Sequence, residues 1–77
     1  MLLSELETGC KGIIEGNCLL GRMRRRMLEL GFFEGSLVEC VGESVFRSPR
    51  AYLVKGTVLA LRNDDACKIY IKAATNV

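Results

Sequence analysis

The clearest helical pattern in the chain covers residues 20–30. Apolar residues recur there at the spacing of one helix face, which predicts an amphipathic helix packed on a core. Gly31 follows at the position where a helix end favours a left-handed residue, and Gly35 marks a second turn. The apolar stripe consists of Leu20, Met23, Met27 and Leu30.

The rest of the chain alternates between apolar and polar residues, as strands do. Residues 68–72 show this best, with Ile69 and Ile71 on one side and Lys68, Tyr70 and Lys72 on the other. The expected strands are residues 10–18, 37–41, 51–55, 57–62 and 68–72. The pattern predicts a mainly β fold, a small, bent, SH3-like antiparallel barrel of about five strands with one helix. We expect residues 1–77 to form a single domain.

Local chemistry predicts two short helical turns and a change of direction at Gly56. Ser4 could cap a single helical turn near the start, and Asn63 or Asp64 could cap a short turn near residue 65. At Gly56, the absence of a neighbouring Asn or Asp disfavours a tight hairpin. A continuous strand that bends sharply at Gly56 is an equally good interpretation of the pattern, because such bends close small barrels.

Composition and charge limit the classes of function and partner that are expected for this chain. The chain has 77 residues, 49% of them hydrophobic, which favours a packed globule with a small core. A net charge of +2 permits nucleic-acid binding but does not favour it, and no nucleic-acid partner is expected. The sequence has no run of about 18 apolar residues, so no segment is expected to insert in a membrane. The start of the chain carries acids and no base before Lys11, unlike a signal peptide, so we expect a cytoplasmic protein.

The cysteines show no Cys-x-x-Cys spacing, and the chain has no histidine. The sequence therefore lacks the usual zinc-site pattern. We expect Cys10, Cys18, Cys40 and Cys67 to be small buried side chains. A disulfide stays open if the source is a hyperthermophile, and a four-thiolate metal site is the least favoured reading.

Catalysis is not expected. The chain lacks histidine, a nucleophile elbow and a phosphate-binding glycine loop. Its adjacent carboxylates, Asp64 and Asp65, are more typical of a helix cap than of a metal site. We interpret the chain as a non-enzyme that requires no cofactor.

The helix instead carries a dense arginine cluster at positions 22, 24, 25 and 26. Such a cluster can be a solvated helix face, or it can anchor an acidic partner surface or a phosphate group, because arginine pairs well with both carboxylates and phosphates. Of two consecutive phenylalanines on an extended stretch, one enters the core and one faces out, where it can serve as an interface hot spot. The candidate partner-binding residues are Arg22, Arg25, Arg26, Phe32, Phe33, Phe46 and Pro49.

Two motifs in order resemble the FeoA family. The first is the run from Arg25 to Phe32, Arg-Arg-Met-Leu-Glu-Leu-Gly-Phe, followed by Gly35 and Val38. The second half of the chain resembles the family's closing strands through Pro49, Gly56, Leu59-Ala60-Leu61-Arg62, Asp65-Ala66 and Ile69-x-Ile71.

This resemblance implies an SH3-like barrel that acts as an accessory of the FeoB ferrous-iron transporter and docks on its cytoplasmic GTP-binding domain. The alternative is a metal-sensing domain, akin to the C-terminal domain of metal-dependent repressors, that binds Fe²⁺ or Zn²⁺ through cysteine and carboxylate ligands. The ligand spacing does not support a metal site, so no metal residue is assigned. An exposed strand edge, or the surface around Phe32 and Phe33, could also make the protein a homodimer.

Overall fold

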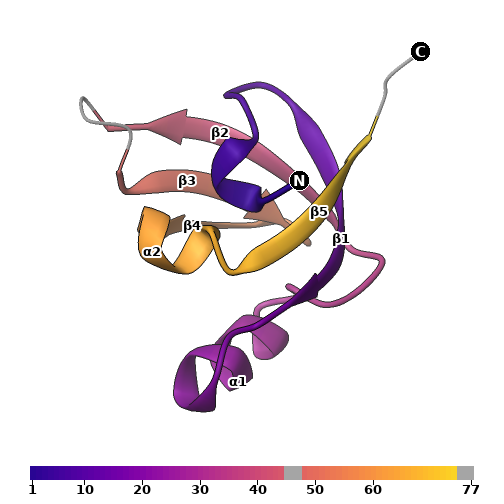
Figure 1. Ribbon diagram of the computed structural model, residues 1–77. Coiled ribbons are helices and arrows are strands. Elements are labelled where there is room, and N and C mark those ends of the chain that lie inside the picture. The colour runs from indigo at the N-terminus through magenta and orange to yellow at the C-terminus, as the bar shows by residue number, and fades with distance from the viewer. Residues whose placement is uncertain (45–47, 75–77) are drawn as a thin grey trace.

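The computed structural model describes residues 1–44 and 48–74. Their strands form one antiparallel sheet in the order β4-β3-β2-β1-β5, which curls around a central core (Figure 1). This confirms the mainly β fold with one longer helix. The strands are β1 Lys11–Asn17, β2 Leu37–Glu43, β3 Arg50–Val54, β4 Thr57–Leu61 and β5 Ile69–Ala74, and the helices are η1 Leu3–Glu5, α1 Gly21–Glu29 and α2 Asn63–Ala66.

Two interruptions in register bend the sheet. The pairing of β1 with β5 shifts between Ile14 and Gly16, and the pairing of β2 with β3 shifts between Cys40 and Gly42. Bulges of this kind increase local twist and bend a strand, which lets a short sheet curl. The sheet therefore bends at these two sites, and not at Gly56 as predicted.

Gly56 belongs to a tight hairpin, so the expectation of a bent continuous strand there is wrong. Val54 pairs with Thr57, and the two residues between them have positive φ angles, 53° at Lys55 and 79° at Gly56. Two such residues form the hairpin turn that matches strand twist. The Lys55 stem packs over Gly31, and its ammonium group lies 5.2 Å from the centre of the Phe33 ring. These contacts, which local sequence does not reveal, favour the turn.

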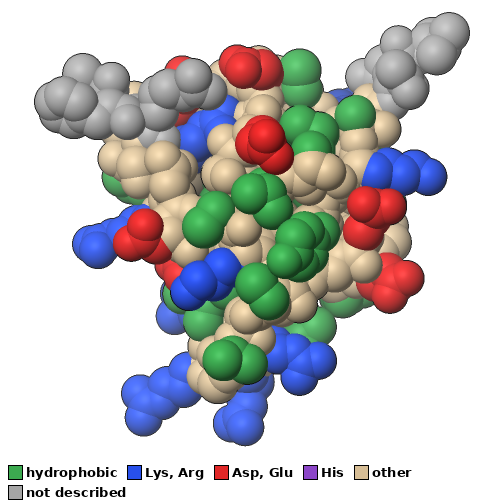
Figure 2. Space-filling view, viewed as in Figure 1, with side chains coloured by type: hydrophobic (Ala, Val, Ile, Leu, Met, Phe, Trp, Pro, Cys, Tyr) green, Lys and Arg blue, Asp and Glu red, His purple; other side chains and the backbone are tan. Residues whose placement is uncertain are grey.

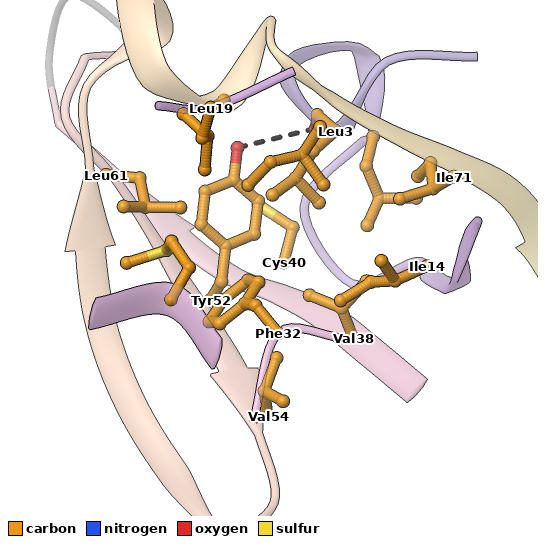
Figure 3. Close-up of a cluster of buried hydrophobic side chains, with 14 residues drawn as sticks. Leu3, Ile14, Leu19, Phe32, Val38, Cys40, Tyr52, Val54, Leu61 and Ile71 are labelled. Carbon is orange, nitrogen blue, oxygen red and sulfur yellow. Dashed lines mark hydrogen bonds between the residues drawn. The ribbon is translucent and has the colours of Figure 1, made fainter. Parts of the chain in front are cut away.

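The core gathers around Tyr52, whose ring lies among apolar side chains from all parts of the fold (Figure 3). Its hydroxyl donates a hydrogen bond of 3.4 Å to the carbonyl oxygen of Leu3. Burial raises the pKa of Tyr52 above its ordinary value of 10.0, and the nearby Arg50 partly opposes this. The buried apolar residues include Leu3, Ile14, Phe32, Val38, Cys40, Tyr52, Val54, Ile69 and Ile71.

The long helix is slightly shorter than predicted, and part of its stripe is wrong. Met27 is buried and Met23 and Leu30 pack against the core, but Leu20 is 83% exposed. Leu20 is the N-cap residue with extended backbone, so its side chain does not continue the helical stripe. At the other end Gly31 has φ +99°, which confirms the predicted left-handed cap.

Neither short helix is capped as expected. The amide of Leu2, before η1, donates to Oε1 of Glu5 at 2.6 Å, and no cap bond comes from Ser4. Helix α2 follows Arg62 without a side-chain cap. The amide of Asn63 instead donates to Oγ of Ser48 at 3.2 Å, a contact between segments 15 positions apart in the chain.

Only one cysteine has the expected buried place. Cys40 lies in the core, whereas Cys10, Cys18 and Cys67 are exposed, and all four are free thiols. The three exposed residues flank strand and helix ends, just outside β1 and α2, where the alternation of inward and outward side chains no longer applies.

A buried cation in the core was not expected. Arg50 is 1% exposed, although it directly precedes the strand expected at residues 51–55 and no local pattern predicts its burial. Its guanidinium group donates to the carbonyl oxygen of Ser4 at 2.7 Å and to that of Leu6, and its Nε lies 3.5 Å from Oε2 of Glu43. Arg50 thus ties the N-terminal turn to β3.

Candidate docking surface on the arginine helix

Helix α1 carries the predicted arginines into solvent at one end of the molecule. Arg22, Arg25 and Arg26 are exposed, as is Arg24 between them. Within the described residues, none of the four forms an ion pair or a hydrogen bond to another side chain. Figure 2 shows blue side chains at the lower end, where α1 lies in Figure 1, and no red side chain on the face of that tip that is in view.

The outward side of α1 is not purely charged. Successive helical residues turn by about 100°, so Leu28 lies roughly opposite the side that Met23 and Leu30 turn to the core. A shallow hollow of about 320 Å³ is lined by Gly21, Arg24, Arg25 and Leu28. Leu28 is exposed, and Leu20 adds a second exposed apolar side chain at the start of the helix. Apolar groups among arginines are typical of protein interfaces.

The two phenylalanines after the helix divide as predicted, one in and one out. Phe33 is 42% exposed, and the Lys55 ammonium group lies over its ring. Phe32 is 1% exposed and packs in the core (Figure 3), so its assignment as a partner-binding residue is wrong. Its amide donates to the carbonyl oxygen of Met27 at 2.8 Å, which fixes its direction inward.

The remaining two predicted contact residues do not join this surface. Phe46 lies outside the described residues. Pro49 is exposed and follows Ser48 through a cis peptide bond just before β3. In Figure 1 the start of β3 lies well away from α1, so the structure does not bring Pro49 together with the arginines.

The sequence analysis did not predict Leu20 and Leu28 as members of the surface, and it placed Arg24 in the arginine cluster without naming it as a contact residue. The signal for Leu28 was available, because an apolar residue directly after Met27 falls off the core-facing stripe. Leu20 was assigned to that stripe on spacing alone. Its position as N-cap could not be read from spacing.

The described residues do not fit a metal site. Across residues 1–44 and 48–74, no three cysteine or carboxylate side chains gather into a possible metal-binding group. One thiol lies beside a phenol, because the hydroxyl of Tyr70 donates to Sγ of Cys18 at 3.8 Å. This bond is the main cause that raises the pKa of Tyr70. A thiol and a phenol are too few ligands for a stable transition-metal site.

Among the described residues, the longest helix is α1, and no helix has the length and apolar character needed to cross a membrane.

Comparison with known proteins gives consistent results. Residues 1–73 match the FeoA domain family. The chain is 37% identical, over 75 residues, to the Fe(2+) transport protein A/Fe(2+) transporter FeoB fusion protein of Porphyromonas gingivalis. The match covers 94% of this chain but 8% of the fusion protein.

Solved structures agree. FeoA of Stenotrophomonas maltophilia, solved with zinc and named an SH3 domain protein, is 32% identical with a TM-score of 0.83. The match covers 94% of this chain and 89% of that one. The FeoA protein of Chlorobium tepidum, at 24% identity, shares the fold with a TM-score of 0.92 over 97% of this chain and 71% of its own. The SH3-like fold is thus confirmed, and the chain belongs to the FeoA domain family, which is associated with ferrous-iron transport.

Proposed function

We propose that this chain is a non-catalytic, cytoplasmic accessory protein of ferrous-iron uptake that docks through α1 on the cytoplasmic GTP-binding part of a FeoB-type transporter. The observation that carries the proposal is the set of exposed arginines around Leu20 and Leu28 at one end of the molecule, which have no ion-pair partner within residues 1–44 and 48–74. An interface of this kind can combine desolvated apolar contacts with arginine–carboxylate pairs.

The fusion protein of Porphyromonas gingivalis supports the choice of partner. Joining two modules in one chain raises their effective concentration, which favours even a weak contact between them. A separate FeoA chain would have to make the same contact by its own affinity. The exposed arginines suit that task, because complementary charge raises the rate of encounter.

The test is a calorimetric titration of the transporter's cytoplasmic GTP-binding domain with a charge-reversed variant. Arg24→Glu combined with Arg25→Glu should weaken binding by at least about tenfold, because both attraction and pairing are lost. The matched control is Lys68→Glu with Lys72→Glu, which makes the same charge change at exposed positions of the β5 region. Equal weakening by both pairs, or by neither, would count against docking through α1.

Metal sensing is the second hypothesis, and the zinc in the Stenotrophomonas maltophilia structure favours testing it. The described residues give it no ligand group. Stoichiometric Zn²⁺ or Fe²⁺ binding that disappears in a folded variant with all four cysteines changed to serine would establish it. Binding that is weak, or that survives those changes, would leave docking as the better account.

A further inference from the structure

The two edges of the sheet differ in whether another segment of the chain covers them. The outer edge of β5 is covered by the start of the chain, where Leu2 bridges to Tyr70. The amide of Ile71 donates to the carbonyl oxygen of Met1 at 2.8 Å. Figure 1 shows the N-terminal turn beside β5. On the opposite edge, β4 pairs with β3, and no other described residue forms a backbone hydrogen bond along its free side.

The register identifies which backbone groups are free. Val54 pairs with Thr57 across the two-residue turn, and antiparallel pairs alternate between hydrogen-bonded and non-hydrogen-bonded. Thr57 and Leu59 therefore direct their amides to β3, whereas Val58 and Ala60 direct theirs to the open edge. Each of these two residues offers one donor and one acceptor to a further strand.

This edge lacks the usual protection. Natural sheet edges carry charged residues, proline or bulges that prevent pairing with another chain. Thr57–Leu61 contains no charge and no proline, and its register with β3 is regular. Val58 is 59% exposed on it. An unprotected edge of this kind is suited to accept another strand.

A hollow of about 350 Å³ lies beside the edge, between α1 and β4. The half-buried side chains of Met23 and Leu59 contribute its apolar part. Arg26 and Arg62 also line it, with Asp65 as its one carboxylate, so cations outnumber acids there. A strand added to β4 would place alternate side chains toward this hollow.

We propose that the β4 edge binds an extended segment of the partner protein as a sixth strand of the sheet. The segment places an apolar side chain in the hollow between α1 and β4 and a carboxylate near Arg26 and Arg62. This inference rests on the proposed function and adds to it, because it names a second contact beside the arginine surface and the chemistry of the segment that fills it.

Charge favours a foreign segment over a second copy of the same chain. Antiparallel pairing of two β4 edges brings the Lys55 turn of one copy toward the Arg62 end of the other, at both ends of the interface. Like charges facing each other across a strand pair are destabilising. An acidic segment removes that repulsion.

Proline substitutions test the pairing. Ala60→Pro removes an amide that faces the open edge, a place where proline is tolerated in sheets. The matched control is Ala73→Pro on the other edge, two residues after Ile71 and so with the same outward direction. We expect Ala60→Pro to weaken binding of the transporter's GTP-binding domain by roughly tenfold or more, and Ala73→Pro by less than about twofold. Val58→Pro is the second variant, should Ala60→Pro fail to fold.

Amide hydrogen exchange gives a direct readout of the same contact. The amides of Val58 and Ala60 should exchange at least about tenfold more slowly in the complex than in the free chain. If the wild-type chain binds but the edge variants bind equally well and both amides stay unprotected, strand addition is wrong while docking through α1 stands. If the wild-type chain does not bind at all, the proposed function itself fails. Protection that grows with protein concentration in the absence of partner, with dimers in sedimentation, would instead assign the edge to a second copy.

Discussion

Arginine serves two different purposes at two places in this molecule. Arg50 is almost completely buried, and its donors reach the carbonyl oxygens of Ser4 and Leu6 and the carboxylate of Glu43. The arginines of α1 extend into solvent and have no ion-pair partner among the described residues. The surroundings of a guanidinium group therefore determine whether it has a structural or a binding role. A buried cation that is bonded to two backbone carbonyls and paired with one carboxylate holds the fold together, whereas an unpaired cluster is available to another molecule.

The largest change in stability is expected when the buried Arg50 is replaced. Arg50→Met keeps most of the side-chain volume but leaves two carbonyl oxygens without their donor. We expect the free energy of unfolding to fall by about 3 kcal/mol. Arg25→Glu, as the exposed counterpart, should change it by less than about 0.5 kcal/mol. Urea unfolding of both variants measures the difference, and equal stability would contradict the structural role of Arg50.

The adjacent phenylalanines should show a similar division. Phe32→Ala leaves a cavity in the core and should cost about 3 to 4 kcal/mol of unfolding free energy. Phe33→Ala removes an exposed ring and should cost less than about 1 kcal/mol. Its effect should appear instead as weaker binding of the transporter's GTP-binding domain. A severe loss of stability in Phe33→Ala would show that the ring is structural.

A smaller effect should appear at alkaline pH. Burial raises the pKa of Tyr52 above 10.0, so in the unfolded chain this phenol loses its proton at a pH where the folded chain keeps it. Stability should therefore fall as the pH rises through the unfolded value. Tyr52→Phe should make that fall less steep between about pH 9 and pH 11. Urea unfolding at a series of pH values checks this, and identical slopes would contradict it.

Arg50 also influences the alkaline loss of stability, because its guanidinium group lies 6.0 Å from the centre of the Tyr52 ring. A nearby cation favours the phenolate and so lowers the pKa against the effect of burial. In the Arg50→Met background the alkaline fall in stability should be steeper than in the wild-type chain. An unchanged slope would show that the two groups are not coupled.

Much of the fold could be predicted from the sequence, because local periodicity carries it. The inward and outward sides of β5 follow directly from the alternation around Ile69 and Ile71. The helix end at Gly31 follows from the need for a positive φ angle. What failed depended on contacts between distant segments. The Lys55–Gly56 hairpin is supported by packing on Gly31, and the first amide of α2, that of Asn63, donates to the hydroxyl of Ser48.

The site was predictable in part for the same reason. A run of arginines on a helix shows in the sequence, so the exposed cluster was found. The burial of Arg50 was not, because its partners are backbone carbonyls more than 40 positions away, which no local pattern displays. The β4 edge was also hidden, since the sequence does not tell which strands end a sheet.

The central claim is that the α1 end of the molecule contacts the transporter, and an NMR titration tests it most directly. The isotope-labelled chain is titrated with the transporter's cytoplasmic GTP-binding domain, and amide shifts are followed along the described residues. The account predicts shifts concentrated on residues 20–33 and on β4, with small shifts near Pro49. Shifts confined to the start of β3, or no shifts at near-millimolar partner, would contradict it.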